Sequence, residues 1–299
     1  MMDCKKALAA SAGDVSKAMD WLRAKGIARA ASGADRAALE GLVALHIRTP
    51  CVTLVEVNSE TDFVSRNKDF QEFCALVATT AAATGVSDVQ VLLATKSATG
   101  TGTVKDALGD VVNLIRENIV IRRVASFPVE PGSVVAGYVH GKVVFGGPGS
   151  AADDGLQLGK SAAVVTLRPS KSTGPVLAAP AVAALETAAR RLAMHVVAAK
   201  PLYLSELSVP ADVMAKETDI CRQQLDAANQ LAGKKPEVAD KIVRGKVLKR
   251  LSELCLLSQP HVVEEGAPVV GKFLSALALE TAGSGATCSG FERWTVGAQ

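Results

Sequence analysis

The sequence has few of the features that mark a metal-binding, membrane-spanning or nucleic-acid-binding protein. Its six cysteines include no Cys-x-x-Cys pair and its four histidines lack ligand spacing, so we expect no zinc site. Aromatic residues make up only 4% and the formal net charge is only +3, which argues against base-stacking platforms and a strong electrostatic footprint for nucleic acid. Charged residues interrupt the apolar runs before they reach a membrane-spanning length.

What remains has the composition of an ordinary soluble globular protein. Hydrophobic residues make up 48% and charged residues 21% of the 299 residues, enough for two or more lobes with their own cores. The start, Met-Met-Asp-Cys-Lys-Lys, leads directly into a helical pattern and shows no secretory signal. Most cysteines lie among apolar residues, which is typical of reduced and packed thiols.

The most informative segment covers residues 51–64. Its first half alternates β-branched and other residues and therefore predicts a strand. Turn-forming residues follow at 58–62, and Phe63 comes next, before a helix expected to begin near Asn67. Two interpretations stay open: Phe63 fills the corner inside its own lobe, or the corner presents a carboxylate and a large aromatic side chain.

Helical and strand patterns alternate along the rest of the chain. Residues 42–47 and 51–57 predict an antiparallel hairpin, and residues 233–236 predict the tip of a pair of antiparallel helices. The other expected elements are helices over 3–10, 15–22, 67–77, 104–115, 182–199 and 272–279, and strands over 119–127, 134–140, 162–167 and 288–296. This mixture predicts an α+β fold with antiparallel sheets.

Two candidate chemical motifs are weak. Residues 155–161 imitate a phosphate-binding loop, but three residues separate the glycines instead of four, so we assign them to a surface insertion over 146–160. We therefore expect neither a bound nucleotide nor any other cofactor. His195 lies on an apolar helical face, where a lone histidine is commonly a satisfied core residue, and no nucleophile has the spacing of a hydrolase triad with it.

Five segments resemble the elongation factor Ts family, in the same order along the chain. Thr61-Asp62-Phe63-Val64 follows a Glu-Val-Asn strand end and is similar to the family's signature. The other four are Met-Met-Asp-Cys-Lys-Lys-Ala-Leu (1–8), Asn-Ile-Val-Ile-Arg-Arg-Val (118–124), Met-His-Val-Val-Ala-Ala-Lys-Pro (194–201) and Ser-Gln-Pro-His-Val-Val (258–263). One short match would be weak, whereas five collinear matches are specific.

The resemblance implies an architecture. A short N-terminal helical module, similar to a ubiquitin-associated module whose first helix would lie upstream of Met1, precedes a two-lobed core of antiparallel sheets packed by helices, from which an antiparallel coiled-coil hairpin protrudes. The implied boundaries are 1–31 for the module and linker, 38–175 for core subdomain N, 176–208 plus 255–299 for core subdomain C, and 209–254 for the hairpin.

The resemblance also implies a function. Members of the family bind elongation factor Tu and release its GDP, which requires differential binding and no bond chemistry, so we expect a guanine nucleotide exchange factor and not an enzyme. The implied partner is elongation factor Tu, GDP-bound or nucleotide-free, without direct nucleic-acid or membrane contacts. The implied partner-binding residues are Asp62, Phe63 and Val64 at the corner, His195 near the partner's phosphate loop, Met1, Met2 and Lys5 beside its guanine pocket, and Val262 and Val263 on another of its domains.

Alternatives stay open at this point. The chain could be an interaction protein that keeps the fold without exchange, or an enzyme built on Lys160 or a cysteine. The hairpin could form a homodimer or touch only the partner. The basic pI of 8.5 and the low-complexity insertion favour an organellar form in the mitochondrial matrix, with the bacterial cytoplasm or a plastid as alternatives.

Overall fold

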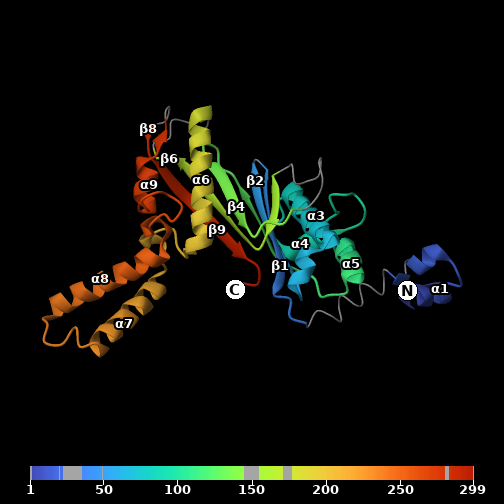
Figure 1. Ribbon diagram of the computed structural model, residues 1–299, viewed down its shortest axis with the longest axis horizontal. Coiled ribbons are helices and arrows are strands. Elements are labelled where there is room, and N and C mark those ends of the chain that lie inside the picture. The colour runs from blue at the N-terminus through green and yellow to red at the C-terminus, as the bar shows by residue number, and fades with distance from the viewer. Residues whose placement is uncertain are drawn as a thin grey trace. The chain divides into compact units, whose positions relative to one another are not determined.

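The computed structural model describes residues 2–19, 21–22, 36–48, 50–144, 155–170, 177–279 and 283–298 (Figure 1). Helices and antiparallel strands share the chain, which confirms the predicted α+β class. Two compact units are present, and each is described by itself. The first consists of Met1–Glu130, Val139–Ala162 and Trp294–Gln299, and the second of Pro131–Tyr138 and Ala163–Arg293. The finer domain boundaries expected from the sequence stay a prediction.

A four-stranded sheet in the order β3-β2-β1-β5 forms the centre of the first unit. β1 and β2 pair antiparallel with Arg48 opposite Cys51, so the predicted hairpin is confirmed. β3 and β5 flank this hairpin, each antiparallel to its neighbour, so β2 is an inner strand and nearly all of it is buried. The bounds are β1 Glu40–Arg48, β2 Cys51–Ser59, β3 Val120–Pro128 and β5 Leu156–Gly159.

Three helices complete the core of this unit: α3 (Lys68–Thr84), α4 (Val89–Ala94) and α5 (Val104–Ile115). α3 begins where predicted because the Asn67 side chain accepts the backbone N–H groups of Asp69 and Phe70. It ends at Gly85, whose φ of 68° is the left-handed conformation that glycine adopts without strain. An apolar stripe of α3 is buried against the sheet: Phe70, Phe73, Cys74 and Val77.

The strand β5 corrects the prediction of a surface insertion over 146–160. Residues 156–159 pair with β1, and Leu156 and Leu158 are buried in the core of the first unit. The strand has only four residues, the last of them a glycine, and is too short for its alternation to be recognised without its partner. The rest of the expected insertion, over 146–154, lies outside the described residues, and Gly155 precedes the strand.

A fully buried carboxylate ties three parts of the first unit together. Glu56 on β2 lies 2.6 Å from Arg123 Nε and 3.2 Å from Arg122 Nη1, both on β3. Its Oε1 also accepts the backbone N–H of Gly297 at 2.9 Å. The guanidinium of Arg123 lies 4.4 Å from the centre of the Trp294 ring. Because these partners satisfy the charge, the cluster is structural and not a candidate for chemistry.

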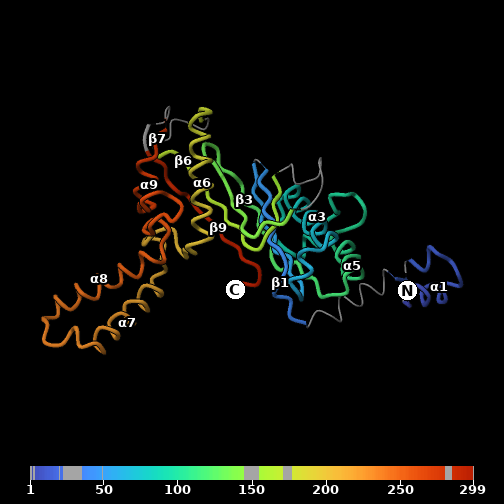
Figure 2. The backbone as a smooth tube through the Cα atoms, viewed as in Figure 1, coloured from blue at the N-terminus to red at the C-terminus, as the bar shows by residue number. Residues whose placement is uncertain are grey.

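The second unit packs the long helix α6 (Ala179–Ala199) on a sheet in the order β4-β6-β9. Small and branched side chains of α6, such as Ala189 and Leu192, meet Val165 and Leu167 of the sheet in one core. Figure 2 follows the chain through these elements. The other bounds are β4 Val134–His140, β6 Ser161–Pro169, β9 Ala286–Thr295, α9 Val270–Ala276, β7 Ala278–Leu279 and β8 Gly283–Ser284.

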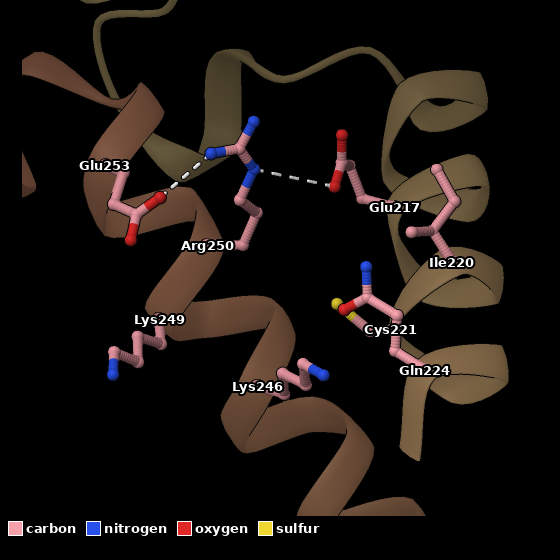
Figure 3. Close-up of a pocket in the computed structure, with 8 residues that line it drawn as sticks. All are labelled: Glu217, Ile220, Cys221, Gln224, Lys246, Lys249, Arg250 and Glu253. Carbon is pink, nitrogen blue, oxygen red and sulfur yellow. Dashed lines mark hydrogen bonds and ion pairs between the residues drawn. The ribbon is translucent and has the colours of Figure 1, made fainter. Parts of the chain in front are cut away.

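The predicted pair of helices over 209–254 is present as α7 (Ala211–Ala227) and α8 (Pro236–Leu254), which pack on each other. Their contact is apolar in the middle and is bridged by Arg222 and Asp240 at 2.8 Å. Figure 3 shows a groove between them, where Arg250 of α8 lies between Glu217 of α7 and Glu253 of α8. That the pair is a coiled coil stays a prediction.

In the N-terminal part of the chain, helices are present at the expected positions: α1 (Met2–Ala10) and residues 15–19 and 21–22. The Asp14 carboxylate accepts the backbone N–H of Lys17 at 3.1 Å, so it caps the second helix. Likeness to a ubiquitin-associated module stays a prediction. Within the described residues, every helix is too short or too polar to traverse a lipid bilayer.

Candidate functional site

The corner after β2 presents Phe63 to solvent. Residues Asp62–Arg66 form one turn of 3-10 helix, η1, between β2 and α3. The Phe63 side chain is 76% exposed, whereas Val64 and Ser65 beside it are buried. The interpretation that Phe63 fills the corner inside its own lobe is therefore wrong. An aromatic ring this exposed is unusual in a chain so poor in aromatics, and it has a contact area available for a partner.

Two carboxylates hold this corner in place from outside η1. Glu117 accepts both the backbone N–H of Thr61 at 3.0 Å and the Thr61 hydroxyl at 2.7 Å. Glu60 accepts the backbone N–H of Asn118 and forms an ion pair with Arg36 at 2.9 Å. The segment between α5 and β3 is thereby fastened to the residues that immediately precede Phe63.

The corner is also held from below. The Ser65 hydroxyl donates to the carbonyl of Asp62 at 2.6 Å, and the buried Gln71 side chain donates to the carbonyl of Ser65 at 2.9 Å. The exposed Asp62 carboxylate has no hydrogen-bond or ion-pair partner in the part of the chain that the structure describes. The side chains that hold the corner within this chain are those of Glu60, Glu117, Ser65 and Gln71.

Sequence reasoning missed Glu60 and Glu117 as supports of the corner. Their roles depend on the pairing of β2 with β3, which places Asn58 opposite Val120 and so brings residues 117–118 to the end of β2. The signal was available in the resemblance, because the segment 118–124 matched the same family as the corner. To find these supports, the segments 51–64 and 118–124 would have had to be placed on neighbouring strands.

His195 of α6 lies fully enclosed in the second unit. Its Nε2 lies 2.9 Å from Oε1 of Gln259, whose own amide group donates to the carbonyl of Glu253 at 2.6 Å. Because that Oε1 can only accept, Nε2 carries the proton and Nδ1 is left as an acceptor. Nδ1 accepts the backbone N–H of Val262 at 3.3 Å. Burial lowers the pKa of His195 below 6.5, and the bond to Gln259 opposes this shift.

The loop that carries Val262 and Val263 is held by further groups of the same cluster. Nδ1 of His261 accepts the backbone N–H of Val263 at 3.3 Å, and its ring lies 5.1 Å from that of His195. Arg191 of α6 donates to the carbonyl of Val263 at 3.1 Å and pairs with Glu264 at 2.8 Å. Burial, with His195 and Arg191 nearby, lowers the pKa of His261 to about 4. Val262 is 57% exposed and Val263 is half-buried.

The remaining predicted site residues divide between surface and interior. Met2 and Lys5 of α1 are exposed, and Met1 lies outside the described residues. Val64 is buried in the core of the first unit and His195 in that of the second, so neither is available for a direct contact in this structure. The exposed candidates are therefore Asp62, Phe63, Met2, Lys5 and Val262.

In the described ranges, no three cysteine, histidine or acidic side chains gather as a metal site would require. Four of the free cysteines are buried, and burial raises the pKa of Cys288 to about 11 and that of Cys74 still further. The thiols of Cys74 and Cys288 are therefore held in the protonated form and are not activated nucleophiles.

Comparison with known proteins identifies the family. The sequence model described as Elongation factor TS matches residues 60–298. Elongation factor Ts of Sphingopyxis alaskensis is 40% identical over 297 residues, which cover 99% of this chain and 87% of that protein. The corresponding protein of Methylocella silvestris is 37% identical over 298 residues with the same coverage, and that of Bdellovibrio bacteriovorus is 37% identical over 282 residues, covering 92% and 83%. The chain belongs to the elongation factor Ts family.

Proposed function

We propose that the protein is a guanine nucleotide exchange factor that binds elongation factor Tu and promotes release of GDP during translation elongation. Membership of the family supports both the partner and the class of activity. The observation that carries the mechanism is Phe63, an exposed ring on a corner fastened by Glu60 and Glu117. The activity is exchange by differential binding and involves no bond chemistry.

In the proposed mechanism, Phe63 inserts between helices of elongation factor Tu next to its magnesium site. Magnesium demands a near-ideal octahedral geometry, so a small displacement of its supporting carboxylate or water weakens the binding of GDP. Burying a phenylalanine side chain supplies about 1.5–3 kcal/mol, which offsets part of the lost nucleotide contacts. Because coupling between two ligands is reciprocal, rebinding of GTP expels the exchange factor in turn.

The other candidate residues take supporting places in this proposal. Met1, Met2 and Lys5 contact the partner beside its guanine pocket, and Val262 with Val263 contacts another of its domains. Asp62 contributes its exposed carboxylate to the interface. The buried Val64 supports the corner from inside the first unit.

The same proposal covers the organisation of the chain. The helical module over 1–31 acts as a ubiquitin-associated-like binding module, core subdomains over 38–175 and over 176–208 plus 255–299 carry the contacts, and the hairpin over 209–254 is a coiled coil that forms a homodimer or touches the partner. The complex forms with GDP-bound and nucleotide-free elongation factor Tu. The bacterial origin of the relatives supports the bacterial cytoplasm, and the mitochondrial matrix stays a prediction.

Replacing Phe63 by alanine tests the proposal. Loss of about 1.5–3 kcal/mol of burial should lower stimulated GDP release from elongation factor Tu by about tenfold or more, measured in stopped flow with a fluorescent GDP analogue. Val91→Ala is the matched control, because Val91 is an exposed apolar residue of the same unit, 54% exposed on α4. An unchanged rate of GDP release with a folded Phe63→Ala variant would contradict the proposed insertion of Phe63 between helices of elongation factor Tu.

The same assay separates the alternatives. A fold-retaining interaction protein would bind elongation factor Tu and leave the rate of GDP release unchanged. A nucleotide-binding enzyme would bind GDP or GTP as an isolated chain, which equilibrium dialysis detects. Either outcome with the wild-type protein contradicts the proposed function.

A further inference from the structure

The loop that carries Val262 is held by acceptors that are unusual for a surface loop. Two successive backbone N–H groups, those of Val262 and Val263, donate to the Nδ1 atoms of two buried imidazoles, each at 3.3 Å. His195 comes from α6, whereas His261 lies within the loop itself. The hydrogen bond to His195 therefore fastens the exposed Val262 to α6 of the second unit.

The protonation of His195 is determined by its other nitrogen. Gln259 presents its carbonyl oxygen to Nε2, because its amide nitrogen is engaged with the carbonyl of Glu253. Nε2 must then be the donor, and Nδ1 has its lone pair directed at the Val262 amide. A protonated imidazole has a hydrogen on both nitrogens and cannot accept this bond.

We infer that His195 is a positioning residue for partner binding, whose neutral imidazole holds the Val262 loop in the shape that elongation factor Tu recognises. This inference rests on the proposed function and deepens it. The role of His195 is indirect, because its side chain is 0% exposed. The residue that reaches solvent is Val262, whose backbone N–H is bonded to His195.

The charged surroundings are compatible with this role. Arg191 of α6 lies near His261 and helps to lower its pKa, and Arg191 forms an ion pair with Glu264 of the loop. Phe273 of α9 covers the far side of His261 with its ring at 5.1 Å. Protonation of His261 would therefore add a positive charge near Arg191, whose partner carboxylate on Glu264 is already engaged.

Two substitutions of His195 separate positioning from simple packing. Asparagine carries its side-chain oxygen at the same place along the side chain as Nδ1 and can still accept the Val262 amide, whereas glutamine reproduces only the group at Nε2. We expect His195→Gln to weaken binding of elongation factor Tu severalfold to about tenfold, and His195→Asn to retain most of it. Equal losses in both folded variants, or none in either, would overturn the inference.

A measurement on the unaltered protein removes the dependence on folding of the variants. Nitrogen-15 NMR of the imidazoles reports the tautomer, and a coupling across the N–H···N bond reports the contact with Val262. We expect His195 with its proton on Nε2, and protection of the Val262 amide that falls as His195 becomes protonated at acid pH. A proton on Nδ1, or amide protection indifferent to this titration, would refute the inference.

If the wild-type chain does not accelerate GDP release, the function is wrong whatever the NMR shows. If it does accelerate release while His195→Gln binds as the wild type does, the function stands and the positioning role of His195 falls.

Discussion

The Phe63 corner of the first unit and the Val262 loop of the second unit both present an apolar side chain, but they are held by opposite kinds of acceptor. At the corner, half-exposed carboxylates of Glu60 and Glu117 accept backbone and hydroxyl protons. At the loop, the acceptors are buried neutral imidazoles. Carboxylates stay acceptors in either protonation state, whereas an imidazole loses its acceptor when it is protonated.

The two surfaces should therefore respond differently to the same perturbation. The corner depends on ionic and hydrogen-bonding groups that water and salt reach. The loop depends on the exclusion of water, which keeps the pKa values of His195 and His261 low. Acid should therefore destabilise the Val262 loop of the second unit before it affects the Phe63 corner. Removal of a surface carboxylate should instead loosen the Phe63 corner of the first unit.

The stability of the second unit should depend strongly on pH. Since burial lowers the pKa of His261 from 6.5 to about 4, its contribution to stability is complete above pH 6.5 and is lost as the pH falls toward about 4. At 1.36 kcal/mol per pKa unit this loss is about 3 kcal/mol, and His195 adds to it in the same direction. Hydrogen exchange of α6 amides measures the change.

His261→Gln is the control for this titration, because it removes the ionisable group and keeps a polar side chain. Its α6 amides should show a smaller loss of stability over the same pH range. If the α6 amides of the wild type give the same free energy of opening at pH 6.5 and near pH 4, the low pKa of His261 is contradicted. The two tryptophans, Trp21 and Trp294, both lie in the first unit, so their fluorescence follows that unit separately.

The next effect concerns the support of the corner. Glu117→Ala removes both bonds to Thr61 and should lower stimulated GDP release severalfold to about tenfold, since Phe63 is then held less rigidly. The measurement is the same release assay, with the thermal midpoint as a check on the fold. Asp110→Ala is the matched control, because Asp110 is an exposed carboxylate in the middle of α5, in the same unit. Equal rates for the two variants would show that the corner needs no such support.

The smallest expected effect is at the loop itself. Val262→Ala removes two methyl groups from a side chain that is 57% exposed, so affinity for elongation factor Tu should fall severalfold, mostly through faster dissociation. Biolayer interferometry measures the rate. Leu207→Ala, at a leucine that is 98% exposed in the same unit, supplies the comparison. If the dissociation rate is the same for Val262→Ala as for the wild type, this loop does not contribute to the interface.

Much of the fold could be predicted from the sequence because local patterns and tertiary structure agree. The hairpin β1–β2, the stripe of α3 and the strand β4 follow from alternation, helical spacing and turn residues. β5 could not be predicted, because a strand of four residues owes its existence to β1 and not to its own pattern. α4 was missed for a similar reason, since six residues give too little periodicity.

The candidate site was less accessible to sequence reasoning. The residue types at the corner were correctly recognised, but alternation and turn propensity are silent on whether the Phe63 ring points in or out. The choice depends on Val64 and Ser65 occupying the interior. The supports at Glu117 and Gln259 lie 56 and 64 positions from the residues they hold, so no local spacing reveals them.

The buried pairing of Glu56 with Gly297 has a consequence for how the chain is made. A nascent chain leaves the ribosome from its amino end, so β2 emerges long before the partner that its carboxylate requires. Until the residues around Trp294 arrive, the first unit has a charge without its full complement of donors, and a product cut short before them retains that defect permanently. The middle of the sheet is therefore completed only when the last residues of the chain have been added.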